Sequence, residues 1–437
     1  MRSTTALAIV RILAYAIIFC LTAFMFYHQA TGEYWADTLV YVQSASNSDA
    51  AFGSYSFVTL IFKPAYAIAG CYGVAATLAA TVVATIAMTE LTLRRMTPGA
   101  KDWVVLAFAI MCNFTCAIYL PFAHKNVYLG IVAGNVWHSP TYLLMKLFSL
   151  CAIYCYLNLS GRFGSQKMPL NWVLFTVFCV LSTGFKPSFI VVFGPTVLAL
   201  RIIALVRDRN TWKTSVAIGV SLALTLGILA VQYTILFPSG ESGGIAFGYG
   251  VIWHHYHGSI LAATVQSFAF PLLVLLSCAK LLKDDENYLL AWMMFVLAYF
   301  EYVFLYETGD RMYDGNMGWS LSFATFYLMA SSVSALFNKW GQAMPCLINS
   351  LNLKTTAKDS PTWSNTVKSG SNAIKLDATS PATTEAIDAV AGSLSAEKGQ
   401  SKRVASAYCI IALAFFAWHE VSGIYFFWLM ATGIGFF

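Results

Sequence analysis

Residues that could carry out catalysis or bind an anion gather in four short segments between long apolar stretches of the chain. The first segment places Glu33 and Asp37 among aromatic residues, and the third reads Trp253-His-His-Tyr-His257. The second and fourth add basic, amide and acidic side chains. Their candidate residues are Lys125, Asn135, Trp137, His138, Glu307, Arg311, Asp314 and Asn316. A further basic residue, Lys186, lies beside a proline where two apolar runs meet.

These residue types suit a site that handles a lipid-linked sugar phosphate. A carboxylate can take the proton of a hydroxyl group, arginine and lysine can hold phosphate, and tryptophan and tyrosine rings can pack against sugar faces. We predict Asp37, which precedes a short surface helix, and Glu307 as catalytic carboxylates. The predicted substrate contacts are Asn135, Trp137, His138, Lys125, Lys186, Arg311, Asp314 and Asn316.

Each candidate also has a purely structural interpretation. Arg311 has Glu307 one helical turn before it and Asp310 beside it, so an internal salt bridge competes with phosphate binding. Lys186 could extend its ammonium group to the membrane surface without any substrate. Tryptophan and tyrosine are common at membrane interfaces whether or not they bind anything. The three charged residues expected inside spans, where ionisable groups are costly, are Glu90, Lys146 and Glu301.

No metal or cofactor is expected from the motifs. The run His254-His255-x-His257 has no nearby cysteine or HExxH pattern, which favours interfacial histidines over a zinc site. Most of the ten cysteines lie inside apolar runs, as buried thiols do. No GxxxxGK[ST] sequence is present, so ATP hydrolysis by this chain is not expected.

The composition requires a membrane environment for the elements that position these residues. Of the 437 residues, 58% are hydrophobic and only 11% are charged, with a mean hydropathy of +0.66. A soluble protein carries roughly 25% charged residues. The net charge of +6 comes from basic residues in short loops, which indicates membrane topology rather than nucleic-acid binding.

We therefore predict an all-α bundle of about 11 (10 to 12) transmembrane spans in a cell membrane. Arg94, Arg95 and Lys101 follow the second span, and the later loops on that side are also basic, which predicts a cytoplasmic N-terminus. The four polar segments then lie outside. The predicted spans are 7–27, 74–93, 103–121, 141–159, 170–185, 188–206, 214–237, 259–279, 288–306, 319–337 and 404–420.

Three regions depart from this pattern. Residues 55–71 are short and contain Pro64, which favours a re-entrant or interfacial helix. Residues 338–403 are rich in Ser, Thr, Ala and Lys and are expected to form a disordered, low-complexity cytoplasmic loop. This loop separates a bundle over 1–337 from C-terminal membrane segments over 404–437, in which 421–437 is a candidate partial span.

The layout resembles that of GT-C-type glycosyltransferases and bacterial surface-polysaccharide polymerases. The likeness rests on the many spans, an acidic first outer loop with Asp37, the segment 55–71, and outer basic residues such as Lys125 and Arg311. It departs in having no paired acidic residues in the first loop and no soluble outer domain. The resemblance implies transfer of a sugar from a polyprenyl-phosphate carrier at the outer face, with membrane lipids and envelope-biosynthesis proteins as partners.

Two other classes of function stay open from the sequence. One is a transporter or flippase of a lipid-linked sugar or small solute, and the other is a non-enzymatic protein of envelope assembly. Transporters usually place charged residues at membrane depth and often contain repeated halves. This chain has few such residues and no evident repeat, which favours the transferase.

Overall fold

The computed structural model describes residues 2–46, 55–161, 168–236, 244–340 and 407–434. In this part of the chain, nine helices are long and apolar enough to cross a membrane, and two shorter apolar helices cover Asp102–Cys112 and Pro169–Phe185. The all-α, multi-pass architecture expected from the apolar runs is therefore present. The predicted low-complexity loop 338–403 lies almost entirely outside the described residues.

The elements follow one another in an order close to the predicted spans. They are α1 (Arg2–Thr31), α2 (Thr38–Ser46), α3 (Val58–Met96), α4 (Asp102–Cys112), α5 (Pro140–Leu159), α6 (Met168–Phe185), α7 (Ser188–Arg207), η1 (Arg209–Thr211), α8 (Trp212–Leu236), β1 (Ile245–Phe247), α9 (Val251–Tyr256), α10 (Ile260–Cys278), α11 (Leu281–Asp284), α12 (Glu286–Phe304), β2 (Leu305–Glu307), η2 (Gly309–Arg311) and α13 (Gly318–Trp340). A C-terminal helix covers Ala407–Ala431.

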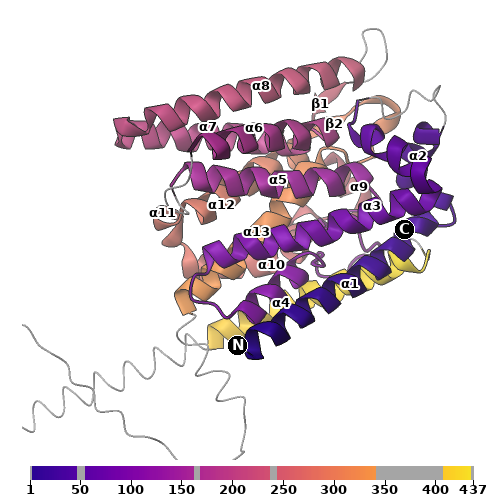
Figure 1. The fold of residues 1–437 in the computed structure, drawn as a ribbon, viewed down its shortest axis with the longest axis horizontal. Helices are drawn as coiled ribbons and strands as arrows, with labels where there is room; N and C mark the ends of the chain where they lie inside the picture. Colours follow the sequence, from indigo (N-terminus) through magenta and orange to yellow (C-terminus); the bar gives the residue numbers. More distant parts are fainter. Residues whose placement is uncertain (1, 47–54, 162–167, 237–243, 341–406, 435–437) are drawn as a thin grey trace, which may run out of the picture. The chain divides into compact units, whose positions relative to one another are not determined.

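Residues 1–338 and 414–437 form one compact unit, in which the long helices run side by side (Figure 1). Short elements gather at its two ends. At one end lie α2, α9 and a hairpin in which β1 pairs antiparallel with β2, with Ile245 opposite Glu307 (Figure 1). We call this the α2 end, and the opposite one, which carries α11, the α11 end. The four polar segments adjoin the elements of the α2 end.

The predicted interfacial segment 55–71 and the span 74–93 belong to one helix, α3, with a sharp break between them. Ala69 and Gly70 have non-helical backbone angles, and Gly70 has φ +58° and ψ −140°. Only glycine adopts that region without steric cost. The helix is therefore kinked at Ala69 and Gly70, close to the end of the predicted interfacial segment.

The helix expected over 103–121 ends at Cys112. The chain continues without regular secondary structure to the start of α5, and its backbone groups bond to distant elements. Cys116 N–H donates to the His419 carbonyl at 3.2 Å, and Ile118 N–H donates to the Gln266 carbonyl at 2.8 Å. Tyr119 N–H donates to Ser422 Oγ at 3.0 Å. Irregular backbone within a membrane protein is tolerated only when the protein supplies such partners.

The C-terminal helix continues past residue 420, so 421–431 is not a separate partial span. Its close approach to the irregular segment depends on Gly423. A Cβ at that position would lie 1.5 Å from the Phe114 carbonyl oxygen. Because Gly423 has no side chain, the C-terminal helix can approach the irregular segment closely enough to form these hydrogen bonds.

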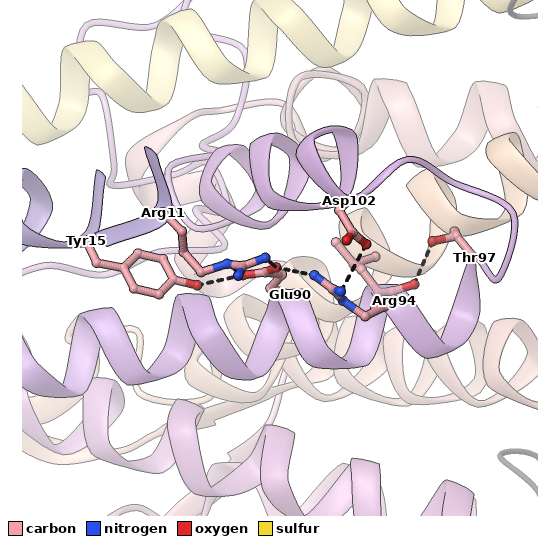
Figure 2. Close-up of polar contacts among 7 residues, drawn as sticks. Arg11, Tyr15, Glu90, Arg94, Thr97 and Asp102 are labelled. Atoms are coloured by element: carbon pink, nitrogen blue, oxygen red, sulfur yellow. Dashed lines mark hydrogen bonds and ion pairs between the residues drawn. The ribbon is translucent and has the colours of Figure 1, made fainter. Parts of the chain in front are cut away.

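Glu90, one of the charged residues expected inside a span, links α3 to α1, and Figure 2 shows Arg11, Tyr15 and Arg94 pointing toward its carboxylate. Its carboxylate accepts hydrogen bonds from Arg11 at 2.7 Å, Arg94 at 2.7 Å and Tyr15 at 2.8 Å. Arg94 also pairs with Asp102 at 2.9 Å. Because two cations and a hydroxyl already surround the carboxylate, Glu90 has a structural role.

The packing at Gly423 gives a first prediction. Gly423→Ala forces a methyl group against the Phe114 backbone, and overpacking of this kind costs about 1–3 kcal/mol. We expect a lower midpoint of thermal unfolding in detergent, measured by circular dichroism. Gly219→Ala in α8, where no heavy atom lies within 4 Å of the added Cβ, is the matched control. Equal midpoints for both variants would contradict the packing described here.

Candidate functional site

A cavity of about 620 Å³ opens at the α2 end between α7, α8, the C-terminal end of α12 and the segment that precedes α13. Most of its wall is apolar, with Val191 from α7, Leu226 and Leu229 from α8, and Leu305 after α12. A small set of polar side chains shares the wall. They are Tyr55, Lys186, Ser188, Gln232, Thr234, Glu301, Glu307, Arg311 and Asn316.

Lys186 supplies a buried cation to this wall, with only 8% of its surface exposed. Its ammonium group lies 4.0 Å from the centre of the Trp319 ring, a cation–π contact, and 3.5 Å from Thr141 Oγ1. Within the described ranges, no carboxylate lies at ion-pair distance from it. Burial lowers the pKa of Lys186 to about 8, and the negative charge of Asp37 partly opposes that shift.

The backbone around Lys186 is held by a clamp between three segments. Phe57 N–H donates to the Gly184 carbonyl at 2.8 Å, and Ser56 Oγ donates to the Phe185 carbonyl at 2.7 Å. Gln232 of α8 donates to the same region of α6, and a Cβ on Gly184 would lie 2.2 Å from the Phe57 ring. The carbonyls left free where α6 ends therefore have partners. This clamp fixes both Lys186 and Tyr55 at the cavity.

The other cation of the wall, Arg311, belongs to an acidic and amide network. Its Nε lies 3.4 Å from Glu307 Oε2 and 3.5 Å from Asp314 Oδ2. Asn316 Nδ2 donates to Glu307 Oε2 at 2.7 Å, and Trp319 Nε1 donates to Asn316 Oδ1 at 2.9 Å. The internal salt bridge considered from the sequence is thus present. About half of the Arg311 side chain is still exposed, so it can also contact a ligand.

Asp37 and His138 adjoin the cavity without lining it. Asp37 precedes α2, and its charge influences both Lys186 and His138. The His138 ring lies 6.0 Å from the Trp319 ring and 5.8 Å from the Trp35 ring. Burial lowers the pKa of His138 to about 4, against the opposing effect of Asp37. His138 is therefore neutral near pH 7, and Lys186 and Arg311 are the cations of this region.

Three predicted contact residues lie elsewhere. Lys125 is exposed on the surface of the α2 end. Asn135 is buried, donates to the Cys112 and Thr115 carbonyls, and accepts a hydrogen bond from Lys146. Trp137 is buried against the rings of Phe114 and Phe427. Asn135 and Trp137 support the irregular segment after α4, which needs internal hydrogen-bond and packing partners.

The remaining predicted residue, Asp314, has a half-exposed side chain and lines a second cavity of about 40 Å³. The structure therefore gathers Lys186, Glu307, Arg311 and Asn316 at one cavity, with Asp37 and His138 beside them.

The cavity also contains residues that the site prediction omitted. Tyr55 lies just before α3, and Trp319 is the second residue of α13, but nothing in their sequence context separates them from ordinary interfacial aromatics. Gln232 lies within an apolar run of α8. Glu301 carried a usable signal, because it is an acidic residue inside a predicted span.

The histidines do not assemble with other ligand types. Among the described residues, no group of three His, Cys, Asp or Glu side chains is placed to hold a metal ion. His124 stacks on His257 with 4.6 Å between ring centres, and His257 Nε2 lies 2.7 Å from Gln266 Oε1. These contacts join the segment before α5 to α9 and α10.

Comparison with known proteins adds no assignment. No family model, curated protein or solved structure matches this chain. The resemblance to GT-C-type enzymes therefore rests on layout alone.

Proposed function

We propose that this protein is a membrane glycosyltransferase or polysaccharide polymerase that uses a polyprenyl-phosphate-linked sugar at the outer face of a cell membrane. The observation that carries the proposal is the combination of Lys186 and Arg311 at a cavity with otherwise largely apolar walls. A ligand that fits both features is anionic at one end and hydrocarbon at the other. A lipid phosphate has this character.

The energetics of Lys186 favour an anionic ligand. A cation taken out of water is costly unless an opposite charge or hydrogen bonds compensate. Here the Trp319 ring and Thr141 provide partial compensation, and Asp37 acts from a greater distance. A phosphate beside Lys186 and Arg311 would supply the missing negative charge and accept hydrogen bonds from both side chains.

The apolar part of the wall suits the lipid chain. Val191 and Leu226 belong to the cavity and are also exposed on the surface of the bundle. Further along the same face of α7, Leu198 and Ile202 are exposed as well. A chain attached to a phosphate at Lys186 could therefore lie along α7 and enter from the side, without crossing a polar surface.

In the proposed reaction, Asp37 takes the proton of an acceptor hydroxyl. The acceptor oxygen then bonds to the anomeric carbon of the donor sugar, and the bond from that carbon to the phosphate oxygen breaks. The electron pair of the broken bond stays on the phosphate, where Lys186 and Arg311 offset the developing charge. Glu307, the second predicted carboxylate, is held by Asn316 and in turn orients Arg311.

The charge distribution supports an outward-facing α2 end and a cytoplasmic N-terminus. Arg94 and Arg95 lie in the last turn of α3 and Lys101 lies just before α4, and this junction falls at the α11 end (Figure 1). Short basic loops are typical of the cytoplasmic side. Membrane lipids surround the bundle, and other envelope-biosynthesis proteins are the expected partners.

One observation favours the alternative of a transporter or flippase. Glu301 is an ionisable residue of a membrane helix and lines the cavity, and such residues often mark transport pathways. Movement of a labelled lipid-linked sugar across proteoliposomes, without any transfer product, would establish this alternative in place of the transferase.

The binding of lipid phosphate can be measured directly with farnesyl phosphate, a short polyprenyl phosphate, and purified protein in detergent. We expect Lys186→Ala and Arg311→Ala each to weaken binding by about ten- to hundredfold, as the loss of a charge-assisted hydrogen bond should. Lys125→Ala removes an exposed lysine of the same end and is the matched control. If the cavity variants and the control bind alike in calorimetry, Lys186 and Arg311 do not form a phosphate site.

The pKa of Lys186 predicts how this binding depends on pH. Lys186 is charged below its pKa of about 8, so raising the pH from 7 to 9 should weaken farnesyl phosphate binding by about tenfold. Farnesyl phosphate stays anionic over this range, so a change in its own charge does not cause the weaker binding. Lys186→Arg keeps its charge at both pH values and should remove the dependence. A wild-type affinity that is flat between pH 7 and 9 would argue against Lys186 as the phosphate ligand.

The role of Asp37 is separable from binding. Asp37→Asn should leave farnesyl phosphate affinity within about twofold of wild type and abolish glycan formation, because the amide cannot accept the acceptor proton. Envelope glycan is measured in cells that depend on the variant, with protein levels checked by immunoblot. Asp49→Asn, which changes an acidic residue twelve positions later in the sequence, is the control. Normal glycan in the Asp37→Asn strain would reject Asp37 as the base.

A further inference from the structure

Glu301 is an acidic residue of the cavity to which the proposed reaction gives no role. It lies in the last turn of α12 and lines the cavity. Its Oε2 accepts a hydrogen bond from Ser320 Oγ at 2.6 Å. Ser320 follows Trp319, whose ring makes the cation–π contact with the Lys186 ammonium group. The Glu301 carboxyl therefore lines the same cavity as Lys186 and Arg311.

The surroundings of Glu301 differ from those of the other cavity carboxylate. Glu307 is held by Asn316 and paired with Arg311. In the part of the chain that the structure describes, no cation lies at ion-pair distance from Glu301. A carboxyl group has about four acceptor positions when ionised, and one donor besides its acceptors when protonated. One hydrogen bond from Ser320 leaves most of this capacity directed at the cavity.

Unused hydrogen-bonding capacity in an apolar wall disfavours a hydrocarbon chain at that point. Burying a polar group without a partner costs free energy, whereas a hydroxyl or amide group would fill the open positions. Leu305 and Met317 line the cavity as well, so the polar character is local. The part of a ligand that reaches this position should therefore carry hydrogen-bonding groups.

We propose that Glu301, oriented by Ser320, forms a subsite for the sugar of the lipid-linked donor and binds its hydroxyl or amide N–H groups. The inference rests on the proposed function, since it takes the phosphate to lie at Lys186 and Arg311. In a lipid-linked sugar, the group attached to the phosphate on the side away from the lipid is the sugar. Sites built to hydrogen-bond a hydroxyl discriminate strongly against analogues that lack it. The cavity should consequently prefer a glycosylated lipid phosphate to the bare one.

The test compares two probes, farnesyl phosphate and glucosyl farnesyl phosphate, on the purified full chain in detergent by calorimetry. Wild type should bind the glucosylated probe about tenfold more tightly, the effect of one or two additional hydrogen bonds. Glu301→Leu should lose this preference and keep its affinity for farnesyl phosphate. Glu301→Gln should retain part of the preference, because an amide still hydrogen-bonds hydroxyl groups.

Two further variants control for indirect effects. Ser320→Ala removes the orienting hydrogen bond and should reduce the preference while preserving farnesyl phosphate binding. Asp310→Asn changes an exposed acidic residue next to Arg311 in the sequence and should leave the affinity for both probes unchanged. Because Ser320→Ala and Glu301→Gln are small changes, they keep the test decisive if Glu301→Leu does not fold.

The outcomes separate the subsite from the function on which it rests. Equal affinity of wild type for both probes, or an unchanged preference in Glu301→Leu, would overturn the Glu301 subsite and leave phosphate binding by Lys186 intact. Failure of wild type to bind either probe would overturn the lipid-phosphate site and the subsite together. Loss of the preference in Glu301→Leu, with a partial reduction in Glu301→Gln and Ser320→Ala and no change in Asp310→Asn, would support the subsite.

Discussion

Backbone N–H and C=O groups find no hydrogen-bond partner in hydrocarbon, so each break in a membrane helix must be paired inside the protein. The chain breaks twice in positions that matter for the cavity. After α4, the irregular segment bonds to His419, Ser422 and Gln266. Between α6 and α7, the Gly184 and Phe185 carbonyls bond to Phe57, Ser56 and Gln232. The second set of bonds holds Lys186 at the cavity.

The same constraint separates structural charges from those available for chemistry. Glu90 is surrounded by Arg11, Arg94 and Tyr15, and its charge is compensated within the bundle. Lys186 has an aromatic ring and a hydroxyl group as its close partners. Both groups are costly to bury. Of the two residues, Lys186 lacks an opposite charge at ion-pair distance among the described residues, and an external anion can supply it.

Much of the architecture could be predicted from the sequence, because long apolar runs define membrane helices by length alone. The predicted helix boundaries were wrong where an apolar segment is not helical, or where a helix continues past the predicted end of a span. Residues 113–121 are as apolar as a span, but their backbone pairs with His419 about 300 residues later, and no local pattern records that contact. The continuation of the C-terminal helix past residue 420 was missed because aromatic and glycine residues there resemble an interfacial boundary.

The charged residues of the candidate site could be predicted from the sequence. Lys186, Glu307 and Arg311 are ionisable residues at the ends of apolar runs, and the structure brings them to one cavity. Asn135 and Trp137 have an equally suggestive composition, yet they satisfy and cover the irregular backbone after α4. A polar or aromatic residue in a loop can therefore either bind a ligand or support irregular backbone. The two roles are distinguished only by whether the neighbouring backbone needs hydrogen-bond and packing partners.

Trp319 shows why the cavity acts as a unit rather than as a set of separate contacts. Its ring faces the Lys186 ammonium group, its Nε1 donates to Asn316, and its neighbour Ser320 donates to Glu301. Asn316 in turn binds Glu307, the partner of Arg311. The first turn of α13 thus connects both cations and both carboxylates of the wall. None of the four groups belongs to α13 itself, so the first turn of this helix links side chains that four other segments of the chain position.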